Sequence, residues 1–119
     1  MIAMADSAFN QTDALKRLMN NKNLYKKLLN KFAAEYSDFV GKITEAFQGD
    51  NFESAVHLTH TMKGLAGNLG ADDLQEASLA LERIAKGGSK TPELDETLEK
   101  FASELNRALK EIADGVDLG

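Results

Sequence analysis

The chain has 119 residues, of which 43% are hydrophobic and 28% are charged, and this is the composition of one ordinary soluble domain. It contains no cysteine, which excludes disulfides and thiolate metal sites and fits a reducing compartment. The net charge of −5 is divided into +1 for residues 1–50 and −6 for residues 51–119, and an acidic chain without a basic stripe is a poor candidate for binding nucleic acid. Because no apolar run approaches the roughly 20 residues of a membrane span, and no signal segment precedes the fold, we expect a cytoplasmic protein without direct membrane contact.

The predicted elements are all helical, because Ala, Leu, Glu and Lys outnumber the Val, Ile and Thr that favour strands. Residues 1–11 are expected to form a flexible N-terminal segment. Thr12 is predicted to cap a short first helix. Its inner face is expected to carry Leu15, Leu18 and Met19. The asparagine-rich stretch 19–23 ends the pattern.

A long second helix is predicted to run from about residue 24 to residue 47. Its apolar residues recur at intervals of three and four, which is the period of an amphipathic helix. They are Leu24, Leu28, Phe32, Phe39, Ile43 and Phe47. Gly49 is expected to end this helix, and Asp50 or Asn51 to cap the next, which should stop near Gly70.

Two further helices complete the predicted fold. One starts at Asp72 or Asp73 and ends at the glycine pair 87–88, and its inward residues are expected to be Leu74, Ala77, Leu81 and Ile84. The other starts at Thr91 and Pro92, which have the chemistry of an N-cap and a first helical residue, and frays after Ala113. Its apolar seam comprises Leu94, Leu98, Phe101, Leu105, Ala108 and Ile112.

Four amphipathic helices joined by short loops predict an antiparallel up-down-up-down four-helix bundle over residues 12–115. The additional short N-terminal helix is expected to cover one end of this bundle. Residues 116–119 are expected to form a flexible C-terminal tail.

The predicted helix that ends near Gly70 carries a histidine opposite its apolar face. Its apolar residues, which cluster within an arc of roughly 80°, are Ala55, Leu58, Met62, Leu65 and Leu69. His60 lies roughly 175° from the centre of that arc, and Lys63 lies about 60° from His60. Gly64 and Gly67 lie within roughly 40° of His60, although each glycine costs about 1 kcal/mol in a helix relative to alanine. Because they point away from the apolar stripe, we expect a partner to approach the backbone there.

This arrangement suits phosphoryl transfer to the histidine. A neutral imidazole nitrogen is a nucleophile, and the ammonium group of Lys63 can offset the charge of a phosphoryl group beside it. The sequence has no Walker-type loop, no nucleotide fingerprint and no carboxylate cluster that could hold Mg²⁺. The phosphoryl group and its metal ion must therefore come from a partner.

The same residues resemble a known family. The pattern H-x-[hydrophobic]-K-G-x-[small]-x-x-[hydrophobic]-G is met by His60, Met62, Lys63, Gly64, Ala66, Leu69 and Gly70. Further matches are Leu24 and Tyr25, Leu28 and Leu29, Phe32, Gly49 and Asp50, Ala55, and Leu81 and Glu82. Over residues 13–113 the chain is similar to the histidine-containing phosphotransfer (HPt) domains of bacterial multistep, two-component phosphorelays. It departs at the bulky Leu65, where the family often has a small residue, and we interpret Leu65 as part of the core.

The resemblance implies that His60 accepts a phosphoryl group from an aspartyl phosphate on a response-regulator receiver domain and passes it to another receiver. Lys63 would place the phosphoryl group, and Glu82 would orient the histidine ring; the alternative for Glu82 is a solvated carboxylate. The surface expected to meet the receiver comprises Glu53, His57, Gly64, Gly67 and Asn68. The protein would be a monomeric carrier with no cofactor or ATP site of its own, because Mg²⁺ would be held by the receiver. A hybrid sensor histidine kinase is a further candidate partner, or the chain to which this domain belongs.

Three alternatives remain at the level of sequence. Glu53, His57 and His60 have a spacing that could chelate a metal, but a closed site needs a fourth ligand, and Lys63 would oppose a cation. The sequence GLAG resembles the loop of KH nucleic-acid modules, which need a sheet and a basic surface. A scaffold bundle with an incidental histidine is the third alternative.

Overall fold

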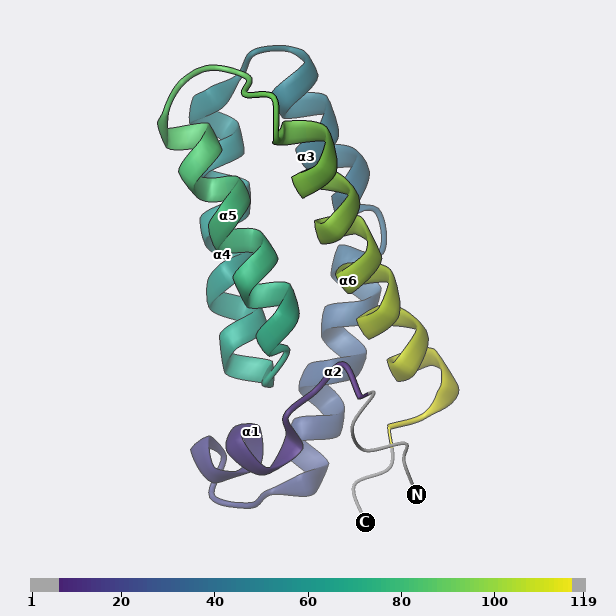
Figure 1. Ribbon diagram of the computed structural model, residues 1–119. Helices are drawn as coiled ribbons and strands as arrows, with labels where there is room; N and C mark the ends of the chain where they lie inside the picture. Colours follow the sequence, from purple (N-terminus) through teal and green to yellow (C-terminus); the bar gives the residue numbers. More distant parts are fainter. Residues whose placement is uncertain (1–6, 117–119) are drawn as a thin grey trace.

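The structure is a computed structural model that describes residues 7–116 (Figure 1). The described part of the chain forms six α-helices and no strand, so the prediction of an all-α fold is confirmed. The helices are α1 (Gln11–Arg17), α2 (Lys22–Tyr36), α3 (Phe39–Gln48), α4 (Phe52–Leu69), α5 (Asp72–Lys86) and α6 (Leu94–Asp114).

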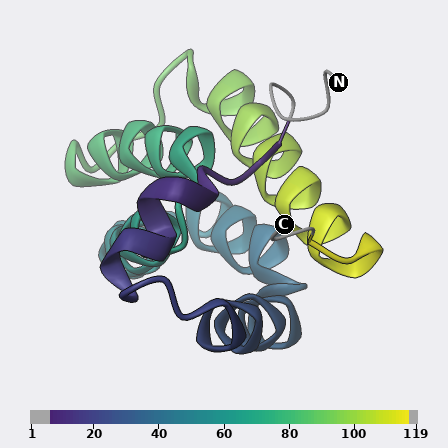
Figure 2. The ribbon, with the colours of Figure 1, turned by 90° about the horizontal axis from the view of Figure 1, so that it is seen from below.

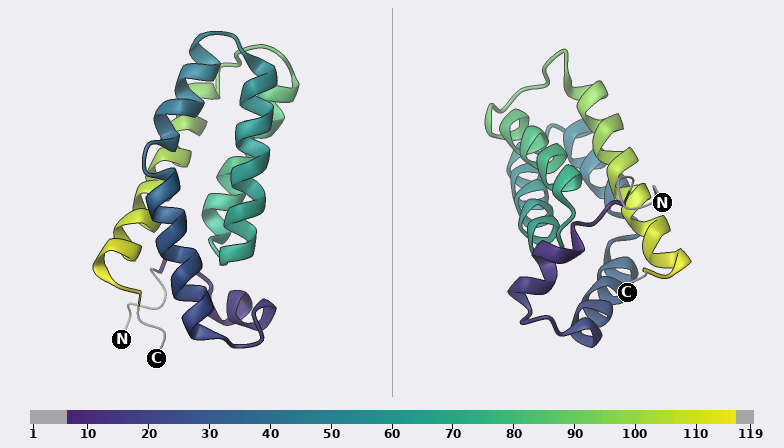
Figure 3. Two further views of the ribbon diagram at one scale, coloured as in Figure 1. Left: turned by 180° about the vertical axis from the view of Figure 1, so that it is seen from behind. Right: turned by 60° about the horizontal axis from the view of Figure 1, so that its bottom comes forward.

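The helices pack side by side along one long axis. The α4 helix packs against α5, and α6 packs against α5 on one side and against α2 and α3 on the other. Figure 1 and the view from behind in Figure 3 show α2 and α3 following one another along one edge, with α4 and α5 beside them. The short α1 lies across the end where α4 finishes, as the view from below in Figure 2 shows.

The core is built from apolar side chains that α2 to α6 contribute at intervals of three and four residues, and α1 adds Ala14. The largest fully buried apolar residues are Tyr25, Leu29, Ile43, Phe47, Met62, Leu74, Leu81, Phe101 and Leu105. Among residues 7–116, three buried residues are polar, namely Thr59, Ser78 and Glu82. The Thr59 and Ser78 hydroxyls donate to backbone carbonyls four residues earlier, so these two need no tertiary partner.

The prediction of one long helix from residue 24 to residue 47 is wrong, because α2 ends at Tyr36, the backbone leaves helical geometry at Asp38 (φ −108°, ψ 15°), and α3 begins at Phe39. Serine and aspartate compete with the helix for backbone hydrogen bonds, so this pair is a weak point. The ring of Tyr36 stacks on Phe32 at 5.3 Å and meets Phe39 edge to face at 5.0 Å. This aromatic cluster spans the break and joins α2 to α3.

Two predicted helix starts also need correction. The α1 helix is capped by Asn10, whose side-chain oxygen accepts a hydrogen bond from Asp13 N at 3.2 Å, and not by Thr12. The α6 helix begins at Leu94, after a turn in which Leu94 N donates to the carbonyl of Thr91 at 3.1 Å. Thr91 and Pro92 therefore lie in a turn before the helix. Of the two predicted caps of α4, Asp50 or Asn51, the structure shows Asn51, whose side-chain oxygen accepts a hydrogen bond from Ser54 N at 3.1 Å.

The inner faces of the first two helices differ from the prediction. Met19, expected to face inward, is 90% exposed and lies in the loop between α1 and α2 with a positive φ of 56°. Leu24 is exposed at the start of α2, and the neighbouring Tyr25 is buried in its place. The hydroxyl of Tyr25 donates a 2.7 Å hydrogen bond to the carbonyl of Leu69. A buried tyrosine needs such a partner, and this one ties α2 to the last turn of α4.

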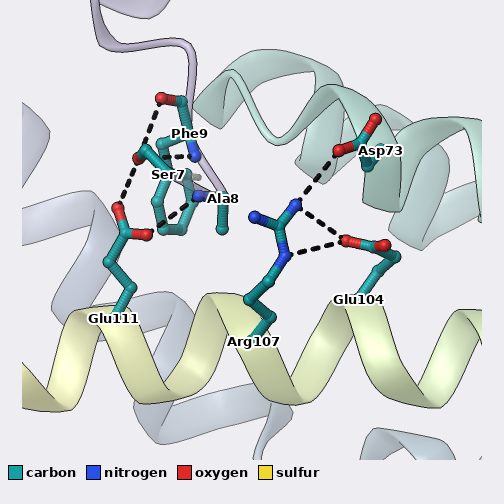
Figure 4. A network of polar contacts seen from close by, with 7 residues as sticks. All are labelled: Ser7, Ala8, Phe9, Asp73, Glu104, Arg107 and Glu111. Carbon is teal, nitrogen blue, oxygen red and sulfur yellow. Dashed lines mark hydrogen bonds and ion pairs between the residues drawn. The ribbon is translucent and has the colours of Figure 1, made fainter. Parts of the chain in front are cut away.

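Residues 7–9, which precede α1, are packed, and this differs from the prediction that residues 1–11 are flexible. Ala8 and Phe9 are buried, and the carboxylate of Glu111 on α6 accepts hydrogen bonds from Ser7 Oγ at 2.6 Å and Ala8 N at 2.8 Å (Figure 4). One turn earlier on α6, Arg107 pairs with Asp73 of α5 at 3.0 Å. Residues 1–6 lie outside the described residues.

At the other end of the described part, Val116 packs against the core, although the prediction places it in the flexible tail of residues 116–119. Residues 117–119 lie outside the described part. Between residues 7 and 116, no helix is long and apolar enough to cross a membrane.

Candidate functional site

The α4 helix carries the central histidine and is fixed at both ends. Asn51 caps its first turn, and Gly70 ends it with a φ of 80°, a left-handed conformation that glycine adopts without strain. A side chain at Gly70 would also meet the carbonyl oxygen of Asn10 at 2.5 Å, so the glycine is needed for close packing of the N-terminal segment. The predicted stop at Gly70 is therefore confirmed.

The buried face of α4 is slightly rotated from the predicted one. It comprises Ala55, Thr59, Met62, Ala66 and Leu69. Leu58 and Leu65 are only half-buried, while the small residues Thr59 and Ala66 lie in the centre of the packed face. The rotation brings His60 and Lys63 toward α5, where both reach a side chain of that helix.

His60 is exposed and held from one side. Its side chain is 66% accessible to solvent, and its Nδ1 atom lies 2.8 Å from Oε2 of Glu82 on α5. Because an ionised carboxylate only accepts hydrogen bonds, Nδ1 carries the proton. In the neutral imidazole the lone pair is then on Nε2, at the other side of the ring. The site therefore presents a nucleophilic nitrogen to solvent in a fixed orientation.

Glu82 is the centre of the site. Its side chain is only 2% exposed, and its Oε1 atom accepts a hydrogen bond from Lys63 Nζ at 2.8 Å. Lys86 Nζ lies 3.5 Å from Oε2, the oxygen that faces His60. The hydrogen bond from Lys63 lowers the pKa of Glu82 most, burial acts in the opposite direction, and the hydrogen bond from His60 and the charges of Lys63 and Lys86 lower it further. The result is a pKa of about 2, against an ordinary 4.5. The carboxylate is therefore ionised at neutral pH. Because its side chain is only 2% exposed, the alternative that Glu82 is a solvated carboxylate is wrong.

The two glycines beside His60 have different surroundings. A Cβ atom added at Gly64 would meet nothing within 4 Å, so this position opens to solvent as predicted. At Gly67, an added Cβ atom would lie 2.3 Å from Nε2 of Gln75 on α5. The carbonyl of Gly67 accepts a hydrogen bond from Arg17 of α1. The expectation of open space at Gly67 is therefore wrong, because Gln75 occupies it.

The remaining predicted surface residues, Glu53, His57 and Asn68, are all exposed on α4. The structure thus brings His60 and Lys63 into contact with Glu82 and leaves Glu53, His57 and Asn68 on the surrounding helix surface. Within residues 7–116, no group of three or more His, Asp or Glu side chains is placed to hold a metal ion.

Lys86 also contacts the site, and it was not predicted from the sequence. The signal was present, since Glu82 and Lys86 have the i, i+4 spacing at which a glutamate and a lysine pair on a helix. Without the packing of α5 on α4, however, Lys86 is indistinguishable from other surface lysines.

The model of the Hpt domain family matches residues 27–115, which is most of the chain and includes His60, Lys63, Glu82 and Lys86. The chain belongs to the Hpt domain family, whose members carry out histidine phosphotransfer in phosphorelays with response-regulator receivers as partners. These domains are phosphoryl carriers and not kinases with an ATP site of their own. Comparison with curated proteins and with solved structures found no significant match.

Proposed function

We propose that His60 accepts a phosphoryl group from the aspartyl phosphate of one receiver domain and passes it to the aspartate of another. The observation that carries this proposal is the contact of Nδ1 with the buried Glu82 carboxylate, at 2.8 Å, on a ring that is 66% exposed. A histidine held at one nitrogen and open at the other is suited to nucleophilic attack on an incoming group.

In the proposed reaction, Nε2 attacks the phosphorus atom of the aspartyl phosphate. The N–P bond forms as the P–O bond to aspartate breaks, and the electron pair of that bond leaves with the aspartate carboxylate. The ring keeps its Nδ1 proton and becomes a cation, for which Glu82 is the counter-ion at 2.8 Å. Transfer to the second receiver is the reverse of these steps.

Lys63 is proposed to turn toward the phosphoryl oxygens when they arrive. Its Nζ atom lies 2.8 Å from Glu82 in the resting protein. Because Lys63 follows His60 by three residues on α4 and has a flexible side chain, a rotation of that side chain would bring its ammonium group to the phosphoryl group. Mg²⁺ would be held by the receiver, where it would offset charge on the same group.

The proposed docking surface is the outer face of α4 around His60. Gly64, one turn after His60, opens to solvent, and Glu53, His57 and Asn68 are exposed on the same helix. Gly67 would contribute its backbone, since Gln75 covers its side-chain position.

We further propose that the domain acts as a cytoplasmic monomer, either free-standing or as a module of a hybrid sensor kinase. We also propose that α2 to α6 form the expected antiparallel four-helix bundle, in which α2 and α3 together take the place of its first long helix. The short α1 would be the additional N-terminal helix.

The experiment that tests the function is incubation with a phosphorylated receiver. The wild-type protein should gain an acid-labile, alkali-stable phosphoryl group, and His60→Gln should gain none. Label that persists in His60→Gln would contradict the proposal. His57→Gln is the matched control, because His57 is the other histidine of the chain and lies one turn away on the same face.

A further inference from the structure

Lys86 contacts the site from outside the motif that surrounds His60. It lies one turn after Glu82 on α5, and its Nζ atom is 3.5 Å from the same carboxylate oxygen that Nδ1 of His60 contacts at 2.8 Å. Lys86 is 62% exposed, whereas Lys63 is 27% exposed. Glu82 therefore has two cationic partners, one on each helix, and each approaches a different oxygen.

The proposed reaction makes two demands on Lys63. In the resting protein it forms the shorter ion pair with Glu82, at 2.8 Å, and during transfer it is needed at the phosphoryl group. A carboxylate that is 2% exposed becomes costly when it loses its ion-pair partner, because little water replaces that partner. Lys63 can leave Glu82 at small cost only if another cation stays.

We propose that Lys86 is a positioning residue, which keeps Glu82 paired and directed at Nδ1 of His60 while Lys63 turns to the phosphoryl group. This inference rests on the proposed function of His60. Lys86 acts through Glu82 and does not touch the phosphoryl group. Because Lys63 holds Glu82 in the resting state, Lys86 matters most in the phosphorylated protein.

The test compares Lys86→Gln with Lys86→Arg and with Arg83→Gln. Arg83 is an exposed residue of the same helix, beside Glu82 in sequence, so Arg83→Gln removes an equal charge without a contact to the site. Each protein is phosphorylated by a phosphorylated receiver and, separately, by phosphoramidate, a small phosphoryl donor that needs no docking. The transfer rate and the ¹H–¹⁵N resonances of the His60 ring are measured in both states.

Lys86→Gln should slow phosphorylation from both donors by about 2- to 5-fold, the factor that corresponds to one exposed ion pair. Its Nδ1–H resonance should match wild type before phosphorylation and should shift or broaden afterwards. Lys86→Arg should restore both properties, and Arg83→Gln should resemble wild type.

Wild-type rates and an unchanged phosphorylated spectrum in Lys86→Gln would overturn the inference. A spectrum altered equally in both states would also overturn it, because Lys86 would then have only a static structural role. Failure of the proposed function has a different signature, namely that the wild-type protein itself gains no phosphoryl group on His60.

Discussion

The Nδ1 atom of His60 on α4 lies 2.8 Å from Oε2 of Glu82 on α5, and the other oxygen of that carboxylate lies 2.8 Å from Nζ of Lys63. One buried carboxylate thus orients the exposed imidazole and holds the nearest ammonium group. The geometry of the site depends on the packing of α4 against α5, and its chemistry on the ionised state of Glu82. Each can be tested by substitution.

Substitutions of Glu82 should separate orientation from charge. Glu82→Gln keeps an oxygen that can accept a hydrogen bond from Nδ1–H, so transfer should continue, slower by a factor on the order of 10 because charge assistance is lost. Glu82→Ala removes the acceptor and should cost on the order of 100-fold. Phosphorylation rates from a phosphorylated receiver measure both effects. Glu76→Ala, an exposed residue of α5, is the control, and wild-type rates in Glu82→Ala would remove Glu82 from the mechanism.

Replacement of Lys63 should slow transfer while the fold survives. Lys63→Ala removes a charge-assisted contact of about 1–2 kcal/mol, which corresponds to roughly 5- to 30-fold in rate. The unfolding transition should remain cooperative, since Glu82 keeps His60 and Lys86 as partners. Lys90→Ala, which breaks a surface ion pair with Asp50, is the matched control. Unchanged kinetics in both directions of transfer would reduce Lys63 to a structural partner of Glu82.

The low pKa of Glu82 predicts a pH dependence of stability. The folded-state pKa of about 2 lies below the ordinary 4.5, so the folded protein binds this proton more weakly than the unfolded chain does. The contribution of Glu82 to stability is therefore fully present above about pH 4.5 and is lost as the pH falls toward 2. In denaturant titrations, the stability difference between wild type and Glu82→Gln should decrease across this window. A difference that is constant with pH would contradict the assigned ion pairs.

Substitutions of Gly64 should separate access from folding. Gly64→Ala should raise the free energy of unfolding by several tenths to about 1 kcal/mol, because the position is helical and a Cβ atom meets nothing there. Gly64→Gln should also fold, yet it should slow receiver-dependent phosphorylation by obstructing docking. Thermal melting and transfer rates measured on the same variants test this. Either an unfolded Gly64→Gln or a folded Gly64→Gln with full activity would contradict the interpretation that Gly64 leaves room for the receiver.

Gly67 provides the contrasting position. A Cβ atom at Gly67 would lie 2.3 Å from the end of the Gln75 side chain, which is exposed and flexible and can move aside. Gly67→Ala should therefore fold with a small change in stability. In the double variant Gly67→Ala, Gln75→Ala, the overlap is absent, so Gly67→Ala should no longer change stability through it. If Gly67→Ala slows transfer as strongly as Gly64→Gln, the side-chain position of Gly67 belongs to the docking surface as well as its backbone.

Much of the fold follows from periodicity and end signals in the sequence. The seam of α6 and the ends of α4 were predictable, because apolar spacing and the residues Asn51 and Gly70 act locally. The break between α2 and α3 at residues 37–38 was not predicted, because Phe32 and Phe39 keep the helical period across it. Only the packed structure shows that Tyr36 bridges these rings.

Contacts of residues 7–8 and of Lys86 were likewise not predictable, because they depend on how distant segments pack. The docking of Ser7 and Ala8 on Glu111 joins residues more than a hundred positions apart, and nothing local in the sequence marks it. The motif identified His60 and Lys63, and the resemblance supplied Glu82. The contact of Lys86 with Glu82 required knowledge of which face of α5 meets α4.

The most direct test of the central claim is to locate the phosphoryl group on the histidine ring by ³¹P and ¹⁵N NMR of the phosphorylated, ¹⁵N-labelled protein. Because Glu82 holds Nδ1, the phosphoryl group should be attached to Nε2 of His60, with Nδ1 still protonated. A phosphoryl group on Nδ1 of His60, or on His57, would contradict the account.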